Sequence, residues 1–455
     1  MITVLKFGGT SVGSAEAIMR SARIITSEKG KKVVVVSAMS GITNFLIHAI
    51  EDKTTDTDTI LEQFRSKHVD TAKEVVADDL MDEFMTEFEK RFKEFEELLR
   101  DKSRRKDPFF TDNLTSQGER FSSLLLSFAI RSLGFKSVAL TSEMAGVFAI
   151  GKPLSGSCDL NKTSARMNMN VKPLLHDDII PVITGFYGIN EEGKPLTFGR
   201  GGSDYAAAAI GNALDADSIE TWTDVDGFMS ADPRLVPTAV VIREMNFNEA
   251  AELAHFGAKV LHPRTIEPAR MKHIPVWVKN SYKPEEPGTQ IHHIKTPGDT
   301  PLKSVAMKLD LSRITIISGE ISYKQCTVAR IMEKFAAAET VIYAISTSLS
   351  SIAFLVHSLD VNKALKYLNE LDDKEIERID VRSNFALICA VGDGLLHRVG
   401  FCGDVFRAVK EVGASVEMIS EGASEVCLNF VVSTDMAANV VKTLHKNFID
   451  GGEQQ

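Results

Sequence analysis

The segment from 197 to 234 holds the turns and side chains best suited to chemistry. Three of the four residues 199–202 are glycine, and residues 205–214 have the alanine-rich composition of a buried helix. Glycine lacks a Cβ atom and tolerates positive φ angles, so backbone N–H groups in such a turn can close around an anion. Ser203 or Asp204 is expected to cap the helix. The pattern predicts a phosphate-binding turn; its alternative is a turn that only begins a core helix.

Acidic residues follow the next expected strand. Residues 218–222 form an apolar stretch suited to a buried strand, and Asp224 and Asp226 come directly after it, before an Asp-Pro turn at 232–233. Ligands of open α/β sheets bind beyond the carboxyl ends of the strands. These carboxylates are therefore expected near the glycine-rich turn.

A lysine near the N-terminus can supply the cation that phosphate chemistry needs. Lys6 lies in an apolar stretch, residues 2–7, next to Gly8 and Gly9. There an ammonium group can meet the oxygens of a transferred phosphoryl group; the alternative is a strand-end lysine that reaches solvent. Residues 9–13 also match the G-x-S-x-G turn of serine hydrolases. Because this turn follows the first strand and no HGGG-like run accompanies it, a hydrolase is disfavoured.

A parallel sheet is needed to bring these turns together. Residues 33–36 are four consecutive valines, which is typical of a parallel strand covered on both faces. With the strand at 2–7 and a helix from about residue 14, they make a βαβ unit. Further strands are expected at 136–140, 179–183, 218–222 and 275–278. The N-terminal part is therefore predicted to be α/β, an open, mainly parallel sheet with helices on both faces.

Two helices before residue 135 carry contrasting side chains. From 80 to 99, phenylalanine and leucine recur at helical spacing, which indicates an amphipathic helix with its aromatic stripe in the core. Glu119 stands near the start of the next helix, where an acidic residue commonly complements the helix dipole. If that helix start faces the glycine turns, Glu119 can instead hold the ammonium group of a substrate.

The C-terminal part predicts a linker and a repeat. Residues 283–301 hold four of the fourteen prolines, which is typical of a linker, and His292 and His293 within it are expected to be solvated. Beyond it, the order strand, helix, strand, strand, helix occurs twice, beginning at 313–318 and at 386–391. Such a repeat predicts two small ferredoxin-like α+β sheets suited to binding or dimerisation, with or without exchange of an edge strand between them. The expected domain limits are 1–295, 303–382 and 384–455.

Composition excludes several classes of protein. The 455 residues carry a formal net charge of −10, which gives no general attraction to nucleic acid or anionic membranes. No apolar run reaches the roughly 18 residues of a membrane-spanning helix. Five scattered cysteines without a CxxC pair fit reduced thiols, and the chain enters a strand at once, so a cytoplasmic protein without a signal peptide is expected. The sequence contains no HExxH motif, the pattern that would indicate a zinc site.

Six motifs in this order resemble those of the aspartate kinases. They are KFGGTS, SGITN, LTSQGE, TFGRGGSDY, WTDVDG with ADPR, and FGAKVLHP. The resemblance covers nearly the whole chain, because the C-terminal repeats resemble the paired ACT domains of that family. It implies an amino-acid-kinase fold and the MgATP-dependent phosphorylation of the L-aspartate β-carboxylate to 4-phospho-L-aspartate, the first step towards lysine, methionine and threonine. It also implies an amino-acid effector at the ACT domains.

The same resemblance assigns roles to individual residues. It implies that Lys6, Asp204 and Arg200 are catalytic, with Asp204 orienting the site. Arg200 would hold the α-carboxylate of aspartate in a bidentate contact, and Glu119 would hold its ammonium group. The residues implied for aspartate are Thr43, Glu119, Arg200 and Ser203. The residues implied for ATP are Lys6, Gly8, Gly9, Thr223, Asp224, Arg234 and Lys259.

Elementary chemistry agrees with this assignment. A carboxylate acceptor is already ionised at pH 7, so phosphorylation requires no general base, and no Ser-His-Asp set is needed. Phosphoryl transfer depends on positioning and on cations and amides around the transferred group, which Lys6, Arg200 and the glycine turns supply without a Walker motif.

Two other functions stay open at this point. Another amino-acid or carbamate kinase would share the glycine turns, but would not need SGITN, LTSQGE and the ACT-like pair together. A catalytically silent amino-acid sensor would keep the fold, although Lys6, Glu119, Arg200 and Asp204 are all present. Because exposed edges of small sheets tend to pair, a homodimer formed through the ACT-like regions is expected.

Overall fold

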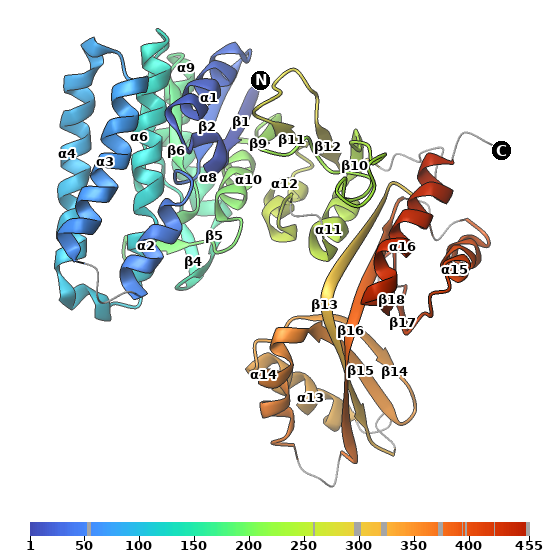
Figure 1. Cartoon of the computed structure of the whole chain (residues 1–455). Coiled ribbons are helices and arrows are strands. Elements are labelled where there is room, and N and C mark those ends of the chain that lie inside the picture. Colours follow the sequence, from blue (N-terminus) through green and yellow to red (C-terminus); the bar gives the residue numbers. More distant parts are fainter. Residues whose placement is uncertain are drawn as a thin grey trace. The chain divides into compact units, whose positions relative to one another are not determined.

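The computed structural model consists of two compact units, coloured along the sequence in Figure 1. Unit 1 is formed by Met1–Phe228, Arg243–Phe247 and Val260–Ile294. Unit 2 is formed by Met229–Ile242, Asn248–Lys259 and Lys295–Gln455. The residues described are 1–51, 56–257, 260–294, 302–319, 325–371, 376–393, 395, 398–422 and 424–451. Within them, the helices are too short or too polar to cross a membrane.

An eight-stranded sheet forms the centre of unit 1, in the order β10-β12-β11-β9-β1-β2-β6-β3. All neighbours pair in parallel except β11 and β12. Its strands are β1 (Ile2–Phe7), β2 (Lys31–Val36), β3 (Ser137–Leu140), β6 (Ile180–Thr184), β9 (Ser218–Thr223), β10 (Glu244–Asn246), β11 (Val276–Asn280) and β12 (Thr289–His292). The predicted open, mainly parallel sheet is confirmed, and the four valines at 33–36 are fully buried in β2.

Helices cover both faces of this sheet. α6 packs on β2, β3 and β6, whereas α10 packs on β1 and β9. Side chains alternate along β1, so Leu5 and Phe7 join the core under α6 while Lys6 points to α10. The helices of unit 1 are α1 (Ala15–Ser27), α2 (Ile42–Glu51), α3 (Thr57–Val75), α4 (Asp78–Arg100), α5 (Phe110–Thr115), α6 (Gln117–Ser132), α7 (Ser142–Ala145), α8 (Leu160–Asn170), α9 (Lys172–His176), α10 (Gly202–Leu214) and α12 (Glu267–Met271). α11 (Phe247–Phe256) begins in unit 1 and continues in unit 2.

Short strands were harder to predict than the central ones. Two hairpins that the sequence did not indicate are β4 (Ala149–Lys152) with β5 (Ser155–Cys158), and β7 (Tyr187–Ile189) with β8 (Pro195–Thr197). The expected linker was wrong in part, because Thr289–His292 is strand β12. His292 is not solvated there: it is buried, and its Nε2 lies 3.7 Å from Glu244. Only two residues of β12, Thr289 and Ile291, are fully buried, too few to give an apolar pattern.

An aromatic core joins α3, α4 and α6. Phe84, Phe88 and Phe95 are fully buried and pack with Phe64 and Phe121, which confirms that the stripe of α4 is core. His68 lies in the same cluster, fully buried, and its Nδ1 donates to the carbonyl oxygen of Phe64 at 2.7 Å. Because the charged imidazolium is poorly solvated there, burial lowers the pKa of His68 to about 4.

We expect His68 to make the fold acid-sensitive. Its unfolded pKa of 6.5 exceeds the folded value, so the unfolded chain binds the proton first and stability falls as the pH drops from 6.5 towards 4. Protonation of His68 in the unfolded chain should lower the free energy of unfolding by about 2 kcal/mol at pH 5. Urea unfolding at pH 7.5 and pH 5 should show this extra loss of stability in wild type and not in His68→Leu. The same change at the exposed His48 is the control; equal pH slopes for all three proteins would contradict the prediction.

Unit 2 is built on one six-stranded sheet in the order β14-β15-β13-β16-β18-β17, with antiparallel neighbours. Its strands are β13 (Ser304–Ile317), β14 (Ile342–Thr347), β15 (Ser351–His357), β16 (Arg378–Val391), β17 (Met418–Ser420) and β18 (Cys427–Ser433). Its helices are α13 (Gln325–Ala337), α14 (Val361–Leu368), α15 (Phe401–Glu411) and α16 (Thr434–His445). The predicted order of elements in the two repeats is confirmed.

The two repeats share this one sheet, whereas the sequence had predicted two small sheets. β13 and β16 begin at Ser304 and Arg378, not at 313 and 386, and the added halves pair across the repeats. Ser304–Lys308 pairs with the end of β16 in the hydrophobic core of the second repeat. Arg313–Ile317 pairs with the beginning of β16 in the hydrophobic core of the first repeat. Each repeat therefore covers its central strand with a strand of the other, which removes an exposed edge.

Candidate functional site

The turns after neighbouring strands of unit 1 meet at one edge of the sheet. The N–H of Gly8 donates to the carbonyl oxygen of Trp222 at the end of β9, and the N–H of Ser37 donates to that of Phe7. The N–H of Gly185, after β6, donates to the carbonyl oxygen of Val36. The carboxyl ends of β9, β1, β2 and β6 are thus linked, at the place where open α/β sheets bind ligands.

Lys6 and Asp204 form an ion pair at this edge. The Nζ of Lys6 lies 2.7 Å from Oδ1 of Asp204, and the two side chains are 8% and 17% exposed. Since Asp204 belongs to α10, the pair joins β1 to the helix that follows the glycine-rich turn. Lys6 therefore does not extend to solvent.

The glycine-rich turn begins α10 without a side-chain cap. Gly201 is the N-cap, with a φ of 69°, and neither Ser203 nor Asp204 caps the helix, contrary to the expectation from the sequence. The reason is that Asp204 is directed at Lys6. An N-terminus without a side-chain cap keeps its N–H groups available to an anion.

Close packing of two glycines brings Ser203 and Glu119 to the same edge. A Cβ atom on Gly185 would lie 2.8 Å from the Cβ of Ser203, and one on Gly118 would lie 2.5 Å from the Cβ of Ala38. Both distances are shorter than real contacts, so glycine is required at these positions. Gly118 lets the first turn of α6 contact the loop after β2, which places its neighbour Glu119.

Glu119 is a buried carboxyl group that forms no ion pair with a described residue. It is 2% exposed, it accepts the backbone N–H of Ala38, and its Oε2 has no hydrogen-bond partner among the described residues. Burial raises the pKa of Glu119 to about 8. Such a group is suited to a ligand that brings its own positive charge.

Two further predicted residues border this edge. Thr43 is partly buried in the first turn of α2, next to Ile42, whose Cγ2 would lie 3.0 Å from a Cβ on Gly118. Arg200 is exposed. Burial, together with the charges of Arg200 and Arg264, lowers the pKa of His262, so Arg200 lies beside that ring.

The predicted ATP residues are only partly brought together. Thr223 ends β9, next to β1, and its hydroxyl donates to the carboxylate of the exposed Asp224 at 3.1 Å. Arg234 lies in unit 2, where its side chain is 87% exposed and pairs with Asp232 at 2.6 Å. Lys259 lies outside the described residues.

Two residues that sequence reasoning missed position the glycine-rich turn. Asp112 of α5 is fully buried and accepts hydrogen bonds from the N–H and hydroxyl of Thr197, at 2.6 and 2.7 Å, and from the N–H of Leu154. Arg264 donates to Ser157 at 2.8 Å, and its guanidinium lies 4.9 Å from the ring centre of Tyr205 in α10. Asp112 stands between Thr111 and Asn113 in the sequence, and nothing local indicates its partners.

Comparisons with known proteins support one assignment. Residues 1–280 match the amino acid kinase family, and residues 388–448 match an ACT domain. The lysine-sensitive aspartokinase 3 of Escherichia coli K12 is 31% identical over 99% of both chains. The chloroplastic aspartokinase 1 of Arabidopsis thaliana is 32% identical over 99% of this chain and 80% of its own length.

Solved structures agree. E. coli aspartokinase III in complex with aspartate and ADP, in the R-state, superposes with a TM-score of 0.82 at 30% identity, covering 98% of this chain and 99% of that one. The same enzyme in complex with lysine and aspartate, in the T-state, gives a TM-score of 0.83 with equal coverage. With the converged strand ends, the Lys6–Asp204 pair and the shared sheet of unit 2, these matches show that the chain belongs to the amino acid kinase family and, within it, to the aspartate kinases.

Proposed function

We propose that unit 1 transfers the γ-phosphoryl group of ATP to the β-carboxylate of L-aspartate, giving 4-phospho-L-aspartate. The observation that carries this proposal is the buried carboxyl group of Glu119, which has no cation among the described residues, at the same sheet edge as the Lys6–Asp204 pair. Ala38 connects the two groups: its N–H donates to Glu119, while its carbonyl oxygen would lie 3.1 Å from a Cβ on Gly9, three residues after Lys6. A substrate between them would meet a carboxylate on one side and an ammonium group on the other.

The residues of this edge suit a transfer without a general base. The β-carboxylate of aspartate is the nucleophile and is ionised at neutral pH. Lys6 neutralises charge on the transferred phosphoryl oxygens, and Asp204 holds Lys6 in place. The turn at Gly8 and Gly9 and the N-terminus of α10 add backbone N–H groups.

Aspartate is held by charges at both of its ends. Glu119 binds the ammonium group, and Arg200 binds the α-carboxylate in a bidentate contact. Thr43 and Ser203 add hydroxyl groups at the starts of α2 and α10. Orientation by the two charged contacts leaves the β-carboxylate directed at Lys6.

MgATP is the second substrate. Thr223 and Asp224 are proposed to contact ATP beyond β9, and the family motifs assign Arg234 and Lys259 to it as well. The described residues contain no group of three or more His, Cys, Asp or Glu side chains arranged around a metal. Mg²⁺ is commonly held by substrate phosphates with one or two carboxylates, so it is proposed to enter with ATP.

The ACT sheet of unit 2 is the proposed regulatory part. An amino-acid effector binds there, and a homodimer forms through its apolar surface, which exposes Ile345 on β14 and Ile419 on β17 at 42% and 46%. The five cysteines are free thiols, which supports a cytoplasmic enzyme. The limits 1–295, 303–382 and 384–455 are kept as the proposed domains.

A coupled assay of ADP release tests the proposed substrate. We expect the full-length protein to prefer L-aspartate over L-glutamate by at least about 100-fold in kcat/KM, because one added methylene misplaces the carboxylate. N-Acetylglutamate lacks the ammonium group for Glu119 and should not react. Turnover of glutamate or acetylglutamate instead would favour another amino-acid kinase. Aspartate binding by calorimetry without turnover of any of the three would favour a silent sensor.

A further inference from the structure

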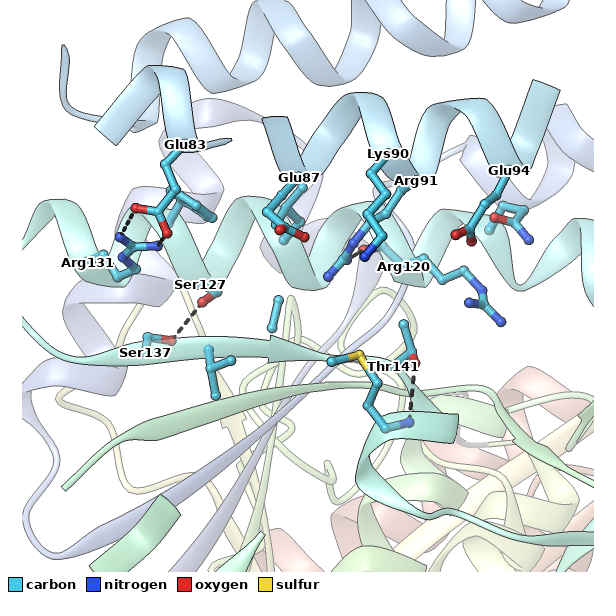
Figure 2. A pocket seen from close by; sticks show the side chains of 16 residues that line it. Glu83, Glu87, Lys90, Arg91, Glu94, Arg120, Ser127, Arg131, Ser137 and Thr141 are labelled. Carbon is cyan, nitrogen blue, oxygen red and sulfur yellow. Dashed lines mark hydrogen bonds and ion pairs between the residues drawn. The ribbon is translucent and has the colours of Figure 1, made fainter. Parts of the chain in front are cut away.

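A pocket lies in unit 1 beside the first turn of α6, the turn that carries Glu119. It has a volume of about 410 Å³ and is bounded by α4, α6 and the edge strand β3 (Figure 2). None of the residues proposed to bind aspartate or ATP lines it. Figure 2 shows a row of charged side chains that descends from α4 towards α6 and β3.

Two of the arginines in this pocket are neutralised by carboxylates. Arg131 makes a bidentate contact with Glu83, at 2.9 and 2.5 Å. Arg120 is paired with Glu143, which also accepts the hydroxyl of Tyr187 at 3.0 Å. These four charges therefore cancel within the protein, although the Nε of Arg120 has no partner among the described residues.

Four other charges in the pocket form no ion pair with the residues that the structure describes. Glu87, Lys90, Arg91 and Glu94 recur at intervals of three and four along one face of α4. Their spacing permits ion pairs along the helix, but Arg91 instead turns towards α6, where it donates to the backbone carbonyl oxygen of Arg120 and, at 3.5 Å, to the hydroxyl of Ser123. Burial lowers the pKa of Arg91, and the nearby charges of Glu87 and Glu94 act in the opposite direction without a direct ion pair. Two cations and two carboxylates thus face one cavity.

The opposite wall of the pocket is largely apolar. Val138 and Ala139 come from β3, and Leu124 and Phe128 come from α6. Ser127 and Ser137 bond to each other at 3.0 Å across this wall. A ligand with two opposite charges at one end and a small uncharged body at the other matches this arrangement.

We propose that this pocket binds a free α-amino acid, with its carboxylate on Arg91 and Lys90, its ammonium group on Glu87 and Glu94, and its side chain against Val138 and Ala139. The pocket disfavours a phosphate or nucleotide, because a multiply charged anion would also meet Glu87 and Glu94. A zwitterion satisfies both signs of charge at once. It needs no net charge from the protein, since the four unpaired charges of the lining sum to zero.

The site also bears on the turn that carries Glu119. Arg91 holds the carbonyl oxygen of Arg120, the residue directly after Glu119. An amino acid that engages Arg91 therefore acts on the first turn of α6. Amide hydrogen exchange in that turn and in α4 is expected to slow when the pocket is occupied.

Calorimetric titration of the full-length protein tests the proposal. The probes are L-alanine, L-valine, L-methionine and L-lysine, with acetate and ethylamine as ligands that carry one charge only. We expect at least one amino acid to bind about tenfold more tightly than acetate or ethylamine, and to lose about tenfold in affinity with Arg91→Met or Glu94→Gln. Lys93→Met removes an exposed charge of the same helix that does not line the pocket, and should leave binding unchanged.

The Lys90→Met variant separates a loss of binding from a loss of folding. Arg91 bonds to α6, so its replacement could loosen the helix pair, whereas Lys90 is exposed and forms no hydrogen bond or ion pair with a described residue. Loss of binding with Lys90→Met at an unchanged unfolding temperature supports the site. Three results overturn the proposal: no amino acid binds; binding is unaffected by both Lys90→Met and Arg91→Met; or acetate binds as tightly as the amino acids.

Discussion

Replacing Lys6 with Met is expected to lower kcat by about 10³-fold or more. Lys6 is the only lysine in the β1 segment, and its ammonium group is fixed by Asp204 at 2.7 Å at the converged strand ends. Removal of one preorganised charge at a transferring group typically costs 10² to 10⁵-fold, or about 3 to 7 kcal/mol of transition-state stabilisation. Single-turnover measurement of phosphoryl transfer with saturating aspartate and ATP isolates this step.

The same substitution leaves Asp204 without its partner, and this effect must be separated from catalysis. Both side chains are mostly buried, so Lys6→Met should also destabilise unit 1 by about 3 kcal/mol. Adding Asp204→Asn should recover most of that stability but none of the activity. Lys29→Met changes an exposed lysine before β2 and should affect neither quantity. Activity of Lys6→Met within about tenfold of wild type would remove Lys6 from the mechanism.

Replacing Glu119 with Gln is expected to weaken aspartate binding while stabilising the fold. The amide cannot pair with the substrate ammonium group, so the KM for aspartate should rise by about 100-fold or more with little change in the KM for ATP. Gln still accepts the N–H of Ala38, and it removes a carboxylate that is buried without a cation. The variant should therefore be more stable than wild type, which is unusual for a change in a binding site.

The pH dependence of both effects follows from the raised pKa of Glu119. Its folded value of about 8 exceeds the ordinary 4.5, so the folded state holds the proton more tightly and wild-type stability falls as the pH rises from about 4.5 to 8. At pH 7 this loss is about 3 kcal/mol, and Glu119→Gln should lack it. Because the ammonium group needs the ionised carboxylate, the KM for aspartate should also rise by about tenfold per pH unit below 8.

Unfolding midpoints between pH 5 and 8 and aspartate KM values between pH 6 and 8.5 check these expectations. Glu16→Gln alters an exposed carboxylate at the start of α1 and serves as the control. If Glu119→Gln destabilises the protein and leaves the aspartate KM unchanged, Glu119 is a structural residue. A pH-independent KM in wild type would likewise contradict its assignment to the ammonium group.

Much of unit 1 could be predicted because its strong patterns are local. Strands β1, β2 and β6 are largely apolar, and the apolar stripe of α4 repeats at helical spacing from 80 to 99. Edge elements are different. In β12 and in the hairpins, burial alternates or covers three or four residues, so hydrophobicity alone does not distinguish them from loops.

The predicted site residues differ in how far the structure unites them. Lys6, Asp204, Ser203 and Glu119 come to one edge of the sheet because parallel strands place their carboxyl ends together and close glycine contacts bring in α6 and α10. The expected cap by Ser203 or Asp204 was wrong, since a side chain that looks like a local cap can have a distant partner. Asp112 and Arg264 were missed for the same reason: the side-chain partners that the structure describes for them are distant in sequence.

The sequence by itself determined the family, the parallel sheet of unit 1, the doubled order of elements in unit 2, and the residue types that the reaction needs. These depend on periodicity, glycine placement and ordered motifs, which are encoded within short segments. Only the tertiary structure decided that Lys6 pairs with Asp204, that Glu119 is buried without a cation among the described residues, that β13 and β16 join two repeats in one sheet, and that α4 leaves four charges facing a cavity. Each of these depends on which distant groups share a buried space, and burial, not residue type, sets the strength of a charge and the partner it takes.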